Sequence, residues 1–576
     1  MAQERTAGRH PTLVEELRFH ACTCLDPAVT VGAAGDDEVD YPAFWERVVG
    51  CAGWLTDHGV RPGDYVALEM DTTTSVMVAS VAVPACGAVL VPLGASRGLR
   101  NGAQDTLRTL AALRVTRARW YLAGDDPAER QVAIRAAGLR VDVLGLAGCP
   151  TGAAGHDEEA VGTRPDPDRP ALVQFSSGSL AAPRGIVLTH GNLAANLHAL
   201  TRRVRFTAGR TVCWLPFTHD MGLIGSLWGS LYGGSAFRGL TPGSFIRHPL
   251  RWIEELSAFR ATHTSAPPFA YAMAARSARR TSASDRLTGV DLSALRVAII
   301  GAERVVPGLC ARFEETFAAQ GLPRHVLLPA YGLAENCVAV ACRTPLIPSA
   351  VGLFAADALE HGRLVRTAPG PAARELIGHG TPLPGTEVRI ISPDGQELPA
   401  GQVGEIRIRG MSVARRVILP DGTMHPTAQE DGLVPTGDLG ALYDGELYVI
   451  GRSKEVVKYA GRLLAPADIE QAVLDAAPEE LGAAAAVAVP REEETEDLVL
   501  FLELAGGRQA ADEDRLTRIA RLTVLREFRI PVSEVFIARR GALPRTTSGK
   551  VKRLSLGAAC LTGTLPPSVR LSAAAP

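Results

Sequence analysis

Lysine is scarce in this chain. Only four of its 60 basic residues are lysines, and all four lie after residue 450: Lys454, Lys458, Lys550 and Lys552. Because arginine supplies the positive charge everywhere else, a retained lysine indicates a position that needs a compact ammonium on a flexible stem. A solvated surface charge is the ordinary alternative, and we assign Lys458 and Lys552 to it.

Other absences exclude whole classes of protein. The ten cysteines form no CxxC pair and no Cys/His cluster with zinc spacing, which predicts a reduced, cytoplasmic chain. The first residues, Met1 to Arg18, are polar and lack the apolar stretch of a signal peptide. The longest uncharged run, Thr72 to Ser96, is broken by Pro84 and Pro92, so it predicts a buried helix and a buried strand rather than a membrane span.

The composition is that of a globular protein. Its 576 residues predict roughly four domain-sized units. With 46% hydrophobic and 21% charged residues, the chain can bury a sizeable core. A formal net charge of −2 argues against a nucleic-acid coat or a polybasic membrane binder. We therefore expect neither nucleic acid nor a membrane as a partner.

Helical and strand patterns alternate in the first part of the chain. Phe44–Leu55 has helical periodicity, and strands are predicted at Tyr65–Glu69, Ala88–Pro92 and Val141–Leu146. Such alternation predicts an α/β fold with parallel sheets. The stretch Gly148–Pro170, rich in Gly, Pro and Asp, predicts a surface linker.

The pattern changes along the rest of the chain. Two further apolar strands, Ala171–Phe175 and Val297–Gly301, run into turns of small residues. Residues 386–450 alternate between short strands and Gly/Asp/Pro turns, which favours a smaller antiparallel or barrel-like piece. After Arg452 the pattern is α+β, and Thr562–Pro576 is expected to be a frayed tail.

Several short segments are candidates for chemistry, although each is weak alone. The loop Ser176-Ser-Gly-Ser-Leu-Ala-Ala-Pro-Arg-Gly185 offers hydroxyls, free N–H groups and a basic end for phosphates, but a plain turn is the commoner meaning of such a loop. Glu335 has a position suited to Mg²⁺, or merely starts a helix; Tyr331 has one suited to stacking on a base, or is core. Asp438 lies in a tight turn, where it binds ribose hydroxyls or caps the turn.

The order of these segments resembles a known family, the adenylate-forming superfamily of acyl-CoA synthetases, peptide-synthetase adenylation domains and luciferases. The resemblance covers about residues 35–555. It rests on five ordered motifs, which rarely coincide: Ser176–Gly185, Tyr331-Gly-Leu-Ala-Glu335, Thr436-Gly-Asp438, Gly451-Arg-Ser-Lys454 and Pro544…Gly549-Lys550.

Within the superfamily the chain is most similar to the fatty acyl-AMP ligases. The stretch Trp214-Leu-Pro-Phe-Thr-His-Asp-Met-Gly-Leu-Ile-Gly225 resembles the His-Asp-Met-Gly segment of that branch, and Ala266–Tyr271 resembles its acyl-pocket segment. About forty residues, Cys337–Gly378, separate Glu335 from the Gly380–Gly385 turn. The branch carries an insertion there, which is thought to impede the swing that admits CoA.

The resemblance implies an α/β, adenylate-forming enzyme fold. The expected N-terminal region, residues 1–451, holds two α/β subdomains plus a distorted β-barrel, with the insertion at about 337–378. The expected lid, residues 452–576, is a small α+β domain that pivots at Lys454. Residues Met1–Asp37 match nothing in this pattern.

The resemblance also implies a role for each motif residue. Lys550 lies near the substrate carboxylate and the α-phosphate, and Glu335 carries Mg²⁺. Asp438 binds the ribose, Arg452 lies near the ribose and the hinge, and Lys454 is the hinge. Tyr331 and the Gly301-Ala302-Glu303 turn would line the adenine. The remaining residues expected to bind ATP or AMP are Gly332 and, in the phosphate loop, Ser176, Ser177, Gly178, Ser179 and Arg184.

The class of acid substrate is predicted from His219. In amino-acid-activating relatives an Asp at this position pairs with the substrate ammonium, so His219 argues against an α-amino acid, with Asp220 as the alternative partner for an ammonium. An apolar tunnel is expected, although plain core packing gives the same pattern; its side chains are Trp214, Phe217, Met221, Leu223, Ile224, Phe269 and Met273.

One departure from the family pattern concerns the phosphate loop. Leu180-Ala181 stands where the family usually has Thr-Gly, which should weaken the contacts to pyrophosphate. Arg184 keeps the basic end of the loop. Slow catalysis is therefore an expectation.

The predicted function has two steps. ATP and a medium- to long-chain fatty acid give acyl-AMP and pyrophosphate, and the phosphopantetheine thiol of a separate acyl carrier protein then displaces AMP, in lipopeptide or polyketide biosynthesis. The cofactors expected are ATP and Mg²⁺. No Asp-Ser-Leu attachment site follows residue 550, so the carrier is expected on another chain. An acyl-CoA synthetase and a non-catalytic binding relic are the alternatives.

Overall fold

The computed structural model divides the chain into two compact units. The first comprises residues 1–349, 379–388 and 408–435, and the second comprises residues 350–378, 389–407 and 436–576. The predicted boundary at residue 451 remains a prediction. The structure describes residues 10–24, 27–31, 37–94, 103–156, 161, 165–175, 183–279, 284–348, 351–459, 462–490, 496–505, 512–546 and 549–572.

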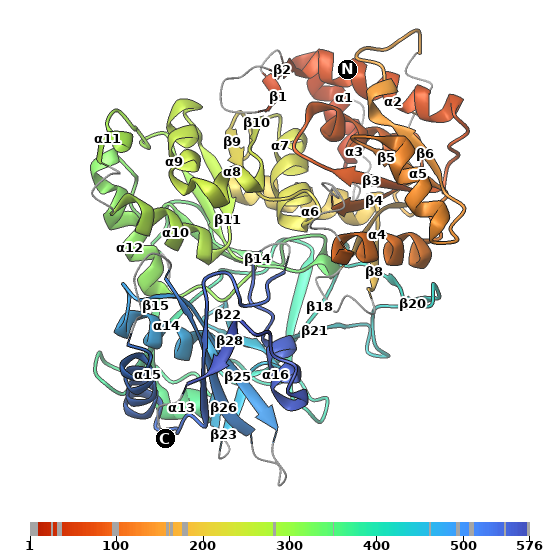
Figure 1. Cartoon of the computed structure of the whole chain (residues 1–576). Coiled ribbons are helices and arrows are strands. Elements are labelled where there is room, and N and C mark those ends of the chain that lie inside the picture. Colours follow the sequence, from red (N-terminus) through yellow and green to blue (C-terminus); the bar gives the residue numbers. More distant parts are fainter. Residues whose placement is uncertain are drawn as a thin grey trace. The chain divides into compact units, whose positions relative to one another are not determined.

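The first unit contains an eight-stranded mixed sheet with a parallel centre. Its order is β20 (Met424–Pro426), β19 (Arg416–Ile418), β8 (Gly185–Thr189), β7 (Pro170–Phe175), β4 (Val89–Gly94), β3 (Tyr65–Met70), β5 (Trp120–Ala123) and β6 (Asp142–Gly145). The helices of this region, drawn in red to orange in Figure 1, are α2 (Tyr41–Asp57), α3 (Thr74–Ala85), α4 (Ala103–Thr116) and α5 (Pro127–Ala136). The helix and three strands predicted here are confirmed.

A second eight-stranded sheet of the first unit has parallel pairs from β1 to β13 and one antiparallel strand at each edge. Its order is β14 (Ala341–Cys342), β13 (Leu327–Tyr331), β12 (Val297–Ile300), β11 (His263–Ala266), β9 (Arg210–Cys213), β10 (Ala236–Gly239), β1 (Pro27–Val31) and β2 (Asp37–Asp40). The principal helices are α6 (His190–Val204), α7 (Gly229–Tyr232), α8 (Pro242–Arg247), α9 (Pro249–Ala258), α10 (Pro268–Ala278), α11 (Ser284–Leu287) and α12 (Pro307–Phe317).

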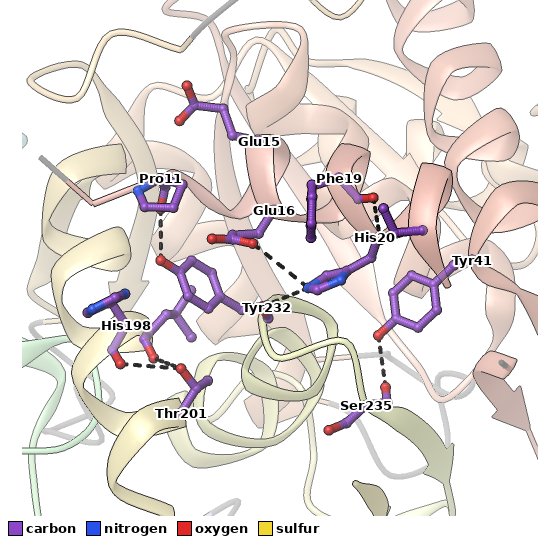
Figure 2. Close-up of polar contacts among 12 residues, drawn as sticks. Pro11, Glu15, Glu16, Phe19, His20, Tyr41, His198, Thr201, Tyr232 and Ser235 are labelled. Carbon is purple, nitrogen blue, oxygen red and sulfur yellow. Dashed lines mark hydrogen bonds and ion pairs between the residues drawn. The ribbon is translucent and has the colours of Figure 1, made fainter. Parts of the chain in front are cut away.

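The chain before residue 37 matches no sequence motif, yet its helix belongs to the first unit. Thr12 caps α1 (Leu13–Thr23) in a capping box with Glu15. Figure 2 shows that the Tyr232 hydroxyl donates to the Pro11 carbonyl at 3.0 Å and that His20 Nε2 lies 3.1 Å from the Tyr232 carbonyl oxygen. The α1 helix is thus tied to α7, the helix that follows the Trp214–Gly225 segment in the chain.

The predicted linker after β6 packs on α2. A Cβ on Gly50 would lie 1.9 Å from the Gly152 carbonyl oxygen, and a Cβ on Gly53 would lie 2.2 Å from the His156 ring. His156 also lies 3.4 Å from the Asp57 carboxylate. Two helix glycines therefore allow this loop to lie directly on the α2 backbone, a contact that the loop's composition alone did not indicate.

The second unit is built from small sheets. β15 (Val351–Ala355) pairs with β16 (Ala373–Ile377), and α13 (Ala356–Glu360) follows β15. A four-stranded sheet, most of whose residues belong to this unit, has the order β17 (Thr386–Ile391), β18 (Gly404–Gly410), β21 (Val434–Tyr443) and β22 (Glu446–Arg452). These strands confirm the short-strand pattern predicted for residues 386–450.

The last part of the second unit is α+β, as predicted. After the hairpin of β23 (Val457–Tyr459) and β24 (Arg462–Leu464), a sheet of β25 (Leu481–Pro490), β26 (Glu496–Leu504), β27 (Glu534–Ala538) and β28 (Val569–Leu571) is accompanied by α14 (Pro466–Ala476), α15 (Glu513–Phe528) and α16 (Arg553–Thr562). The frayed tail predicted from Thr562 is wrong, because β28 pairs antiparallel with β27. Its three residues are too few to give a periodicity.

The later part of the predicted insertion, residues 350–378, belongs to the second unit and is anchored there. The Phe354 ring is fully buried and packs edge-on against Tyr443 and Tyr448 at 5.4 and 5.3 Å between ring centroids. Glu360 Oε2 accepts from Arg462 Nε at 2.7 Å. Arg374 donates to the Glu527 carbonyl at 2.6 Å at the end of α15. The insertion is therefore joined to the C-terminal residues by packing, an ion pair and a hydrogen bond.

Candidate active site

The carboxyl ends of the parallel strands in the second sheet bring several predicted site residues to one edge. Ile300 on β12 is in register with Pro329 on β13, so the Gly301-Ala302-Glu303 turn and Tyr331-Gly332 leave the sheet side by side. Ligands of open α/β sheets bind at such an edge. The structure thus places together the four residues that the resemblance assigns to adenine and Gly332, which it assigns to nucleotide binding.

Two glycines make this edge possible. A Cβ on Gly301 would lie 2.6 Å from the Ala330 carbonyl oxygen, and a Cβ on Gly332 would lie 1.7 Å from the Val338 carbonyl oxygen. Ala302 adopts φ +66°, a left-handed conformation that is uncommon for a residue with a Cβ. Backbone approaches as close as these leave no room for a side chain, which explains glycine at both positions.

Glu335 lies on a short 3-10 helix, Ala334–Asn336, and is half-buried. Its carbonyl oxygen accepts from Ala414 N at 2.7 Å. The next side chain, Asn336, is fully buried and is held on both sides: its Nδ2 donates to the Ala339 carbonyl at 2.6 Å, and its Oδ1 accepts from Ser412 Oγ at 2.7 Å. The turn that carries Glu335 is therefore fixed by buried hydrogen bonds.

His219 and Asp220 form a pair within the Trp214–Gly225 segment. His219 Nδ1 lies 2.7 Å from Asp220 Oδ1, and Asp220 Oδ1 also accepts from Met221 N at 2.7 Å. Both side chains are mostly buried. Since Asp220 already faces the imidazole and a backbone N–H, the structure favours its role as a partner of His219 over that of a free counter-ion for a substrate ammonium.

The segment after Asp220 is a π-helix, Met221–Trp228, all of whose residues are buried. π-helical turns are rare and are frequently found at functional sites. The Ser226 hydroxyl donates to the Met221 carbonyl at 2.8 Å and contacts the Ser265 hydroxyl at 2.6 Å. A Cβ on Gly222 would lie 2.5 Å from the Pro216 carbonyl oxygen, so the chain can turn into this helix only with glycine there.

Two of the aromatic residues predicted to line an apolar tunnel, Trp214 and Phe269, pack together in a larger aromatic cluster. Trp214 stacks on Phe245 with ring centroids 4.0 Å apart and meets Trp252 and Phe269 edge-on at 6.5 and 6.1 Å. Its indole Nε1 is buried and has no hydrogen-bond partner among the described residues. The cluster is apolar; a tunnel through it remains a prediction.

The π-helix Met221–Trp228 and the turn that carries Glu335 lie close together. A Cβ on Gly225, within the π-helix, would lie 3.3 Å from a Val338 methyl group. Burial raises the pKa of the Cys337 thiol well above its usual range, and the negative charge of Asp220 adds to that rise. The first unit thus gathers an apolar helix, a His–Asp pair and the Glu335 carboxylate at one end of its second sheet.

The phosphate loop is only partly described. Ser176, Ser177, Gly178 and Ser179 lie outside the described residues, as does Leu180-Ala181, whereas Arg184 is exposed at the start of β8. Gln174, two residues before the loop, is buried, and its Nε2 donates to the Thr218 carbonyl at 2.8 Å. The strand that leads into the loop is thereby fastened to the residue before His219.

In the second unit Asp438 and Arg452 form the ion pair that joins two of the motifs. The two residues are in register on β21 and β22, and Arg452 Nε lies 3.0 Å from Asp438 Oδ1. Arg452 also donates to the Thr436 carbonyl at 2.7 Å, beside Gly437 at φ +73°. Asp438 is only 7% exposed. Arg452 therefore holds the carboxylate that the resemblance assigns to the ribose.

Lys454 lies in an exposed turn directly after Arg452. The neighbouring Glu455 accepts from Arg553 at 3.0 Å, and Arg553 also donates twice to Glu470, at 2.7 and 2.8 Å. Arg553 opens α16, three residues after Lys550. The predicted hinge and the predicted catalytic lysine therefore belong to segments that the same arginine connects.

Lys550 sits at the base of a tight loop. Its backbone N donates to the Thr546 hydroxyl at 3.1 Å, and its carbonyl accepts from Thr546 N at 2.7 Å. Arg545 donates to the Gly549 carbonyl at 3.1 Å and to the buried Glu503 at 3.3 Å. The half-buried Lys550 is thus held by its backbone, and its catalytic role remains a prediction.

Sequence reasoning missed four residues that position this machinery. Gln174, Asn336, Glu503 and Arg545 each make the contacts described above. Arg545 lies within the Pro544…Lys550 motif but was given no role of its own, and the other three belong to no motif that indicates function. Glu503 lies in an apolar strand and is 5% exposed, and a charge within such a strand was the one signal that could have found it.

Magnesium would find one protein ligand here. Among the residues that the structure describes, no group of three or more His, Cys, Asp or Glu side chains forms a metal cluster. Mg²⁺ is usually held by one or two carboxylates together with substrate phosphates and water. A single carboxylate, Glu335, therefore fits Mg²⁺ that arrives with ATP.

No described helix is long and apolar enough to cross a membrane.

Several known proteins with similar sequences have names that describe the activation of a carboxylic acid. The chain is 34% identical over 414 residues to the medium-chain-fatty-acid–[acyl-carrier-protein] ligase JamA of Moorena producens, which covers 69% of each chain. It is 32% identical over 561 residues to the long-chain-fatty-acid–AMP ligase FadD26 of Mycobacterium marinum, which covers 91% of each chain. A 4-hydroxyphenylalkanoate adenylyltransferase of Mycobacterium bovis is 35% identical over 412 residues, and the match spans 64% of that protein and 66% of this chain.

Solved structures show the same fold. One from work on fatty acyl-adenylate ligases of E. coli and L. pneumophila superposes with a TM-score of 0.84 at 28% identity and covers 96% of this chain and 98% of that one. The adenylate-forming fold and the resemblance to fatty acyl-AMP ligases are thus confirmed. Residues 20–417 match the family model described as AMP-binding enzyme, and the chain therefore belongs to that family of enzymes.

Proposed function

We propose that this protein is a fatty acyl-AMP ligase that loads a separate carrier protein. A medium- to long-chain carboxylate attacks the α-phosphate of ATP and expels pyrophosphate, and a phosphopantetheine thiol then attacks the acyl carbon and expels AMP. The single observation that carries the proposal is the edge of the second sheet, where the buried π-helix Met221–Trp228, the His219–Asp220 pair and the Glu335 turn lie close together.

The residues divide the first step among them. Attack on the α-phosphate builds negative charge, which positive groups must stabilise. Lys550 supplies a compact ammonium for the carboxylate and the α-phosphate, and Asp438, held by Arg452, accepts from the ribose hydroxyls. Glu335 would hold Mg²⁺, which would supply positive charge to neutralise the leaving pyrophosphate. Ser176 to Ser179 and Arg184 hold the β- and γ-phosphates.

A fatty acid fits the acid side of the site better than an amino acid does. The π-helix presents no charged residue, and the one carboxylate beside it, Asp220, is already paired with His219. An incoming ammonium would therefore compete with an existing partner, whereas an alkyl chain meets apolar side chains. The names of the relatives JamA and FadD26 support the same substrate class.

The acceptor is proposed to be a carrier protein rather than CoA. The family mechanism requires the C-terminal residues to swing between the two steps. Here the insertion is bound to those residues by the Glu360–Arg462 ion pair and by the bond from Arg374 to Glu527, which restricts such a movement. The name of JamA, an acyl-carrier-protein ligase, supports this acceptor. A role in lipopeptide or polyketide biosynthesis, in the cytoplasm, completes the proposal.

An acceptor assay tests the proposal. The purified chain receives ATP, Mg²⁺ and a panel of fatty acids, with 4-hydroxyphenylalkanoic acids and amino acids as competitors, and then either CoA or a phosphopantetheinylated carrier protein. Acyl-AMP that accumulates with CoA and is consumed by the carrier supports the ligase. Efficient acyl-CoA formation would instead identify an acyl-CoA synthetase, and ATP binding without pyrophosphate release would identify a non-catalytic relic.

A matched pair of variants tests the acceptor choice. Glu360→Gln removes the charge that pairs with Arg462, and Glu375→Gln changes an exposed carboxylate in the same hairpin. Glu360→Gln should raise acyl-CoA formation several-fold, with adenylation unchanged, and Glu375→Gln should not. Equal CoA use by the two variants and the wild type would remove the insertion's ion pair from the explanation.

A further inference from the structure

One face of α15 combines exposed leucines with arginines. Leu522 and Leu525 are 61% and 53% exposed, and Arg518, Arg526 and Arg529 are exposed around them. At 3.6 residues per turn the four of these side chains within α15, Arg518 to Arg526, fall within about 100° of the helix circumference and extend over about 12 Å of its axis. Arg529 follows as the left-handed C-cap of the helix. We call these five residues the α15 face.

The opposite side of the helix already makes its core contacts. Leu516, Ala520, Val524 and Phe528 are at most 4% exposed and pack in the core of the second unit. The two exposed leucines are therefore not needed to hold the helix in place. A surface helix normally carries polar residues on its outer side, so leucines at the centre of that side require another explanation.

The arginines of the face are available for a partner. Among the residues that the structure describes, none of the three forms an ion pair with a carboxylate, and Arg518 donates only to the Asp514 carbonyl of its own helix, at 3.3 Å. By contrast, Arg515 one turn earlier pairs with Glu480. Glu527, the one acid between residues 518 and 529, lies about 150° around the helix from the centre of the face.

We propose that the α15 face docks an acidic helix of the carrier protein, with the two leucines against an apolar side chain and the three arginines against carboxylates. The proposal rests on the proposed function, which requires a carrier. Arginine is enriched at protein interfaces, and complementary charge around a small apolar centre guides encounter and orientation. The expected contact is small and transient, as a carrier that must leave after each turnover requires.

Two other partners fit the face less well. An anionic membrane would need a broad apolar surface to insert, and this helix offers two leucines, since its other side lies in the core. A nucleic acid would be expected to meet a basic stripe without leucines at its centre. An acidic helix satisfies the charges and the leucines together.

Charge reversal in the holoenzyme tests the inference. Arg518→Glu/Arg526→Glu should lower kcat/KM for the phosphopantetheinylated carrier by about tenfold and reduce its dependence on salt. Leu522→Ala/Leu525→Ala should lower it several-fold. Pyrophosphate release with the fatty acid, and acyl transfer to free pantetheine, should stay within about twofold of wild type because neither step uses the face.

A control on another helix separates docking from a general charge effect. On α5 of the first unit, Arg135 is exposed three residues after Val132, which is 68% exposed. Arg135→Glu should leave carrier kinetics unchanged. A carrier with lysine in place of an acidic helix residue should regain activity with the Arg518→Glu/Arg526→Glu enzyme, which a misfolded variant could not produce.

The outcomes are distinct. Unchanged carrier kinetics in the charge-reversal variant, or an equal loss with free pantetheine, would overturn the docking surface while leaving the ligase intact. If the wild type forms acyl-AMP but acylates no carrier, the proposed function fails and the docking surface fails with it. Binding of the wild type to anionic vesicles, abolished by Leu522→Ala/Leu525→Ala while carrier kinetics stay unchanged, would assign the face to a membrane instead.

Discussion

The edge of the second sheet that carries the candidate site of the first unit and the Lys550 loop of the second unit are held by different forces. The edge is shaped by backbone approaches that only glycine allows, at Gly222, Gly301 and Gly332, and by buried neutral hydrogen bonds. The loop is held by a partly exposed ion pair, Arg545–Glu503, and by bonds within a few residues of chain. Close packing resists displacement in every direction, whereas an ion pair and a tight turn can re-form after a movement.

The difference matches the work proposed for each region. A surface that sorts substrates by shape gains from rigidity, since small shifts of close-packed groups are costly. A lysine that serves one step and then gives way to a thiol gains from a self-contained loop that moves as a piece. Four substitutions or conditions test this contrast.

The largest effect is expected for Lys550→Ala. If the ammonium stabilises charge that develops only in the transition state, its loss should lower the adenylation rate by about 10³-fold with little change in ATP affinity. Pyrophosphate release and calorimetric ATP binding measure the two quantities. Lys552→Ala is the matched control and should be near wild type. A neutral Lys550→Ala would favour the binding relic.

Gly332→Ala should be the most damaging change at the sheet edge. Its Cβ would lie 1.7 Å from the Val338 carbonyl oxygen, and a backbone atom cannot rotate away as a side chain can. We expect destabilisation of about 3 kcal/mol and loss of adenylation. Gly124→Ala, with no atom within 4 Å, is the control. Urea unfolding of both variants measures the expected destabilisation. A wild-type unfolding midpoint for Gly332→Ala would contradict rigid packing at this edge.

Glu503→Gln should have a smaller effect that is kinetic in character. It weakens the bonds from Arg545 and from Leu543 N that hold the base of the Lys550 loop. The expected result is a kcat for adenylation about tenfold lower, with the KM for ATP and for the acid nearly unchanged. Glu480→Gln, which breaks the surface pair with Arg515, is the control. A rise in KM without a fall in kcat would show that Glu503 does not position Lys550.

The smallest effect is a pH dependence of stability in the first unit. Burial lowers the pKa of His263 to about 4, and its Nε2 donates to the Val204 carbonyl at 2.9 Å. Because the unfolded value is about 6.5, the unfolded chain binds more protons between pH 6.5 and 4. His263 therefore stabilises the fold fully above pH 6.5, and this contribution is lost as the pH falls through that window.

A variant isolates the contribution of this histidine. Between pH 7 and 5, His263→Asn should lose less unfolding free energy than the wild type, by about 1–2 kcal/mol. His425→Asn, at an exposed histidine, should follow the wild type. Parallel curves for all three proteins in urea titrations would exclude His263 as a source of acid sensitivity.

Much of the fold was predictable because its signals are local. The strands at Tyr65–Glu69 and Val297–Gly301 and the helix at Phe44–Leu55 follow from periodicity, and the structure places β3, β12 and α2 there. The strand β28 was not predictable, since three residues gain their hydrogen bonds only from β27. The position of α1 depends equally on contacts with distant residues, such as Tyr232.

The candidate site divides in the same way. The order of the motifs and the scarcity of lysine mark Glu335, Asp438, Arg452 and Lys550 from the sequence alone, because those positions need particular functional groups. The residues that hold them, such as Gln174 and Glu503, are ordinary residue types whose roles depend on where the chain folds back. The chemical roles assigned to the four motif residues remain predictions.

By itself the sequence determined the family, the α/β class and the set of groups available for chemistry, because these depend on residue type, order and spacing. Tertiary structure alone decided that His219 pairs with Asp220, that the insertion belongs with the C-terminal residues, and that α15 leaves two leucines exposed. The physical reason is that burial, ion pairing and close approach are relations between residues far apart in the chain.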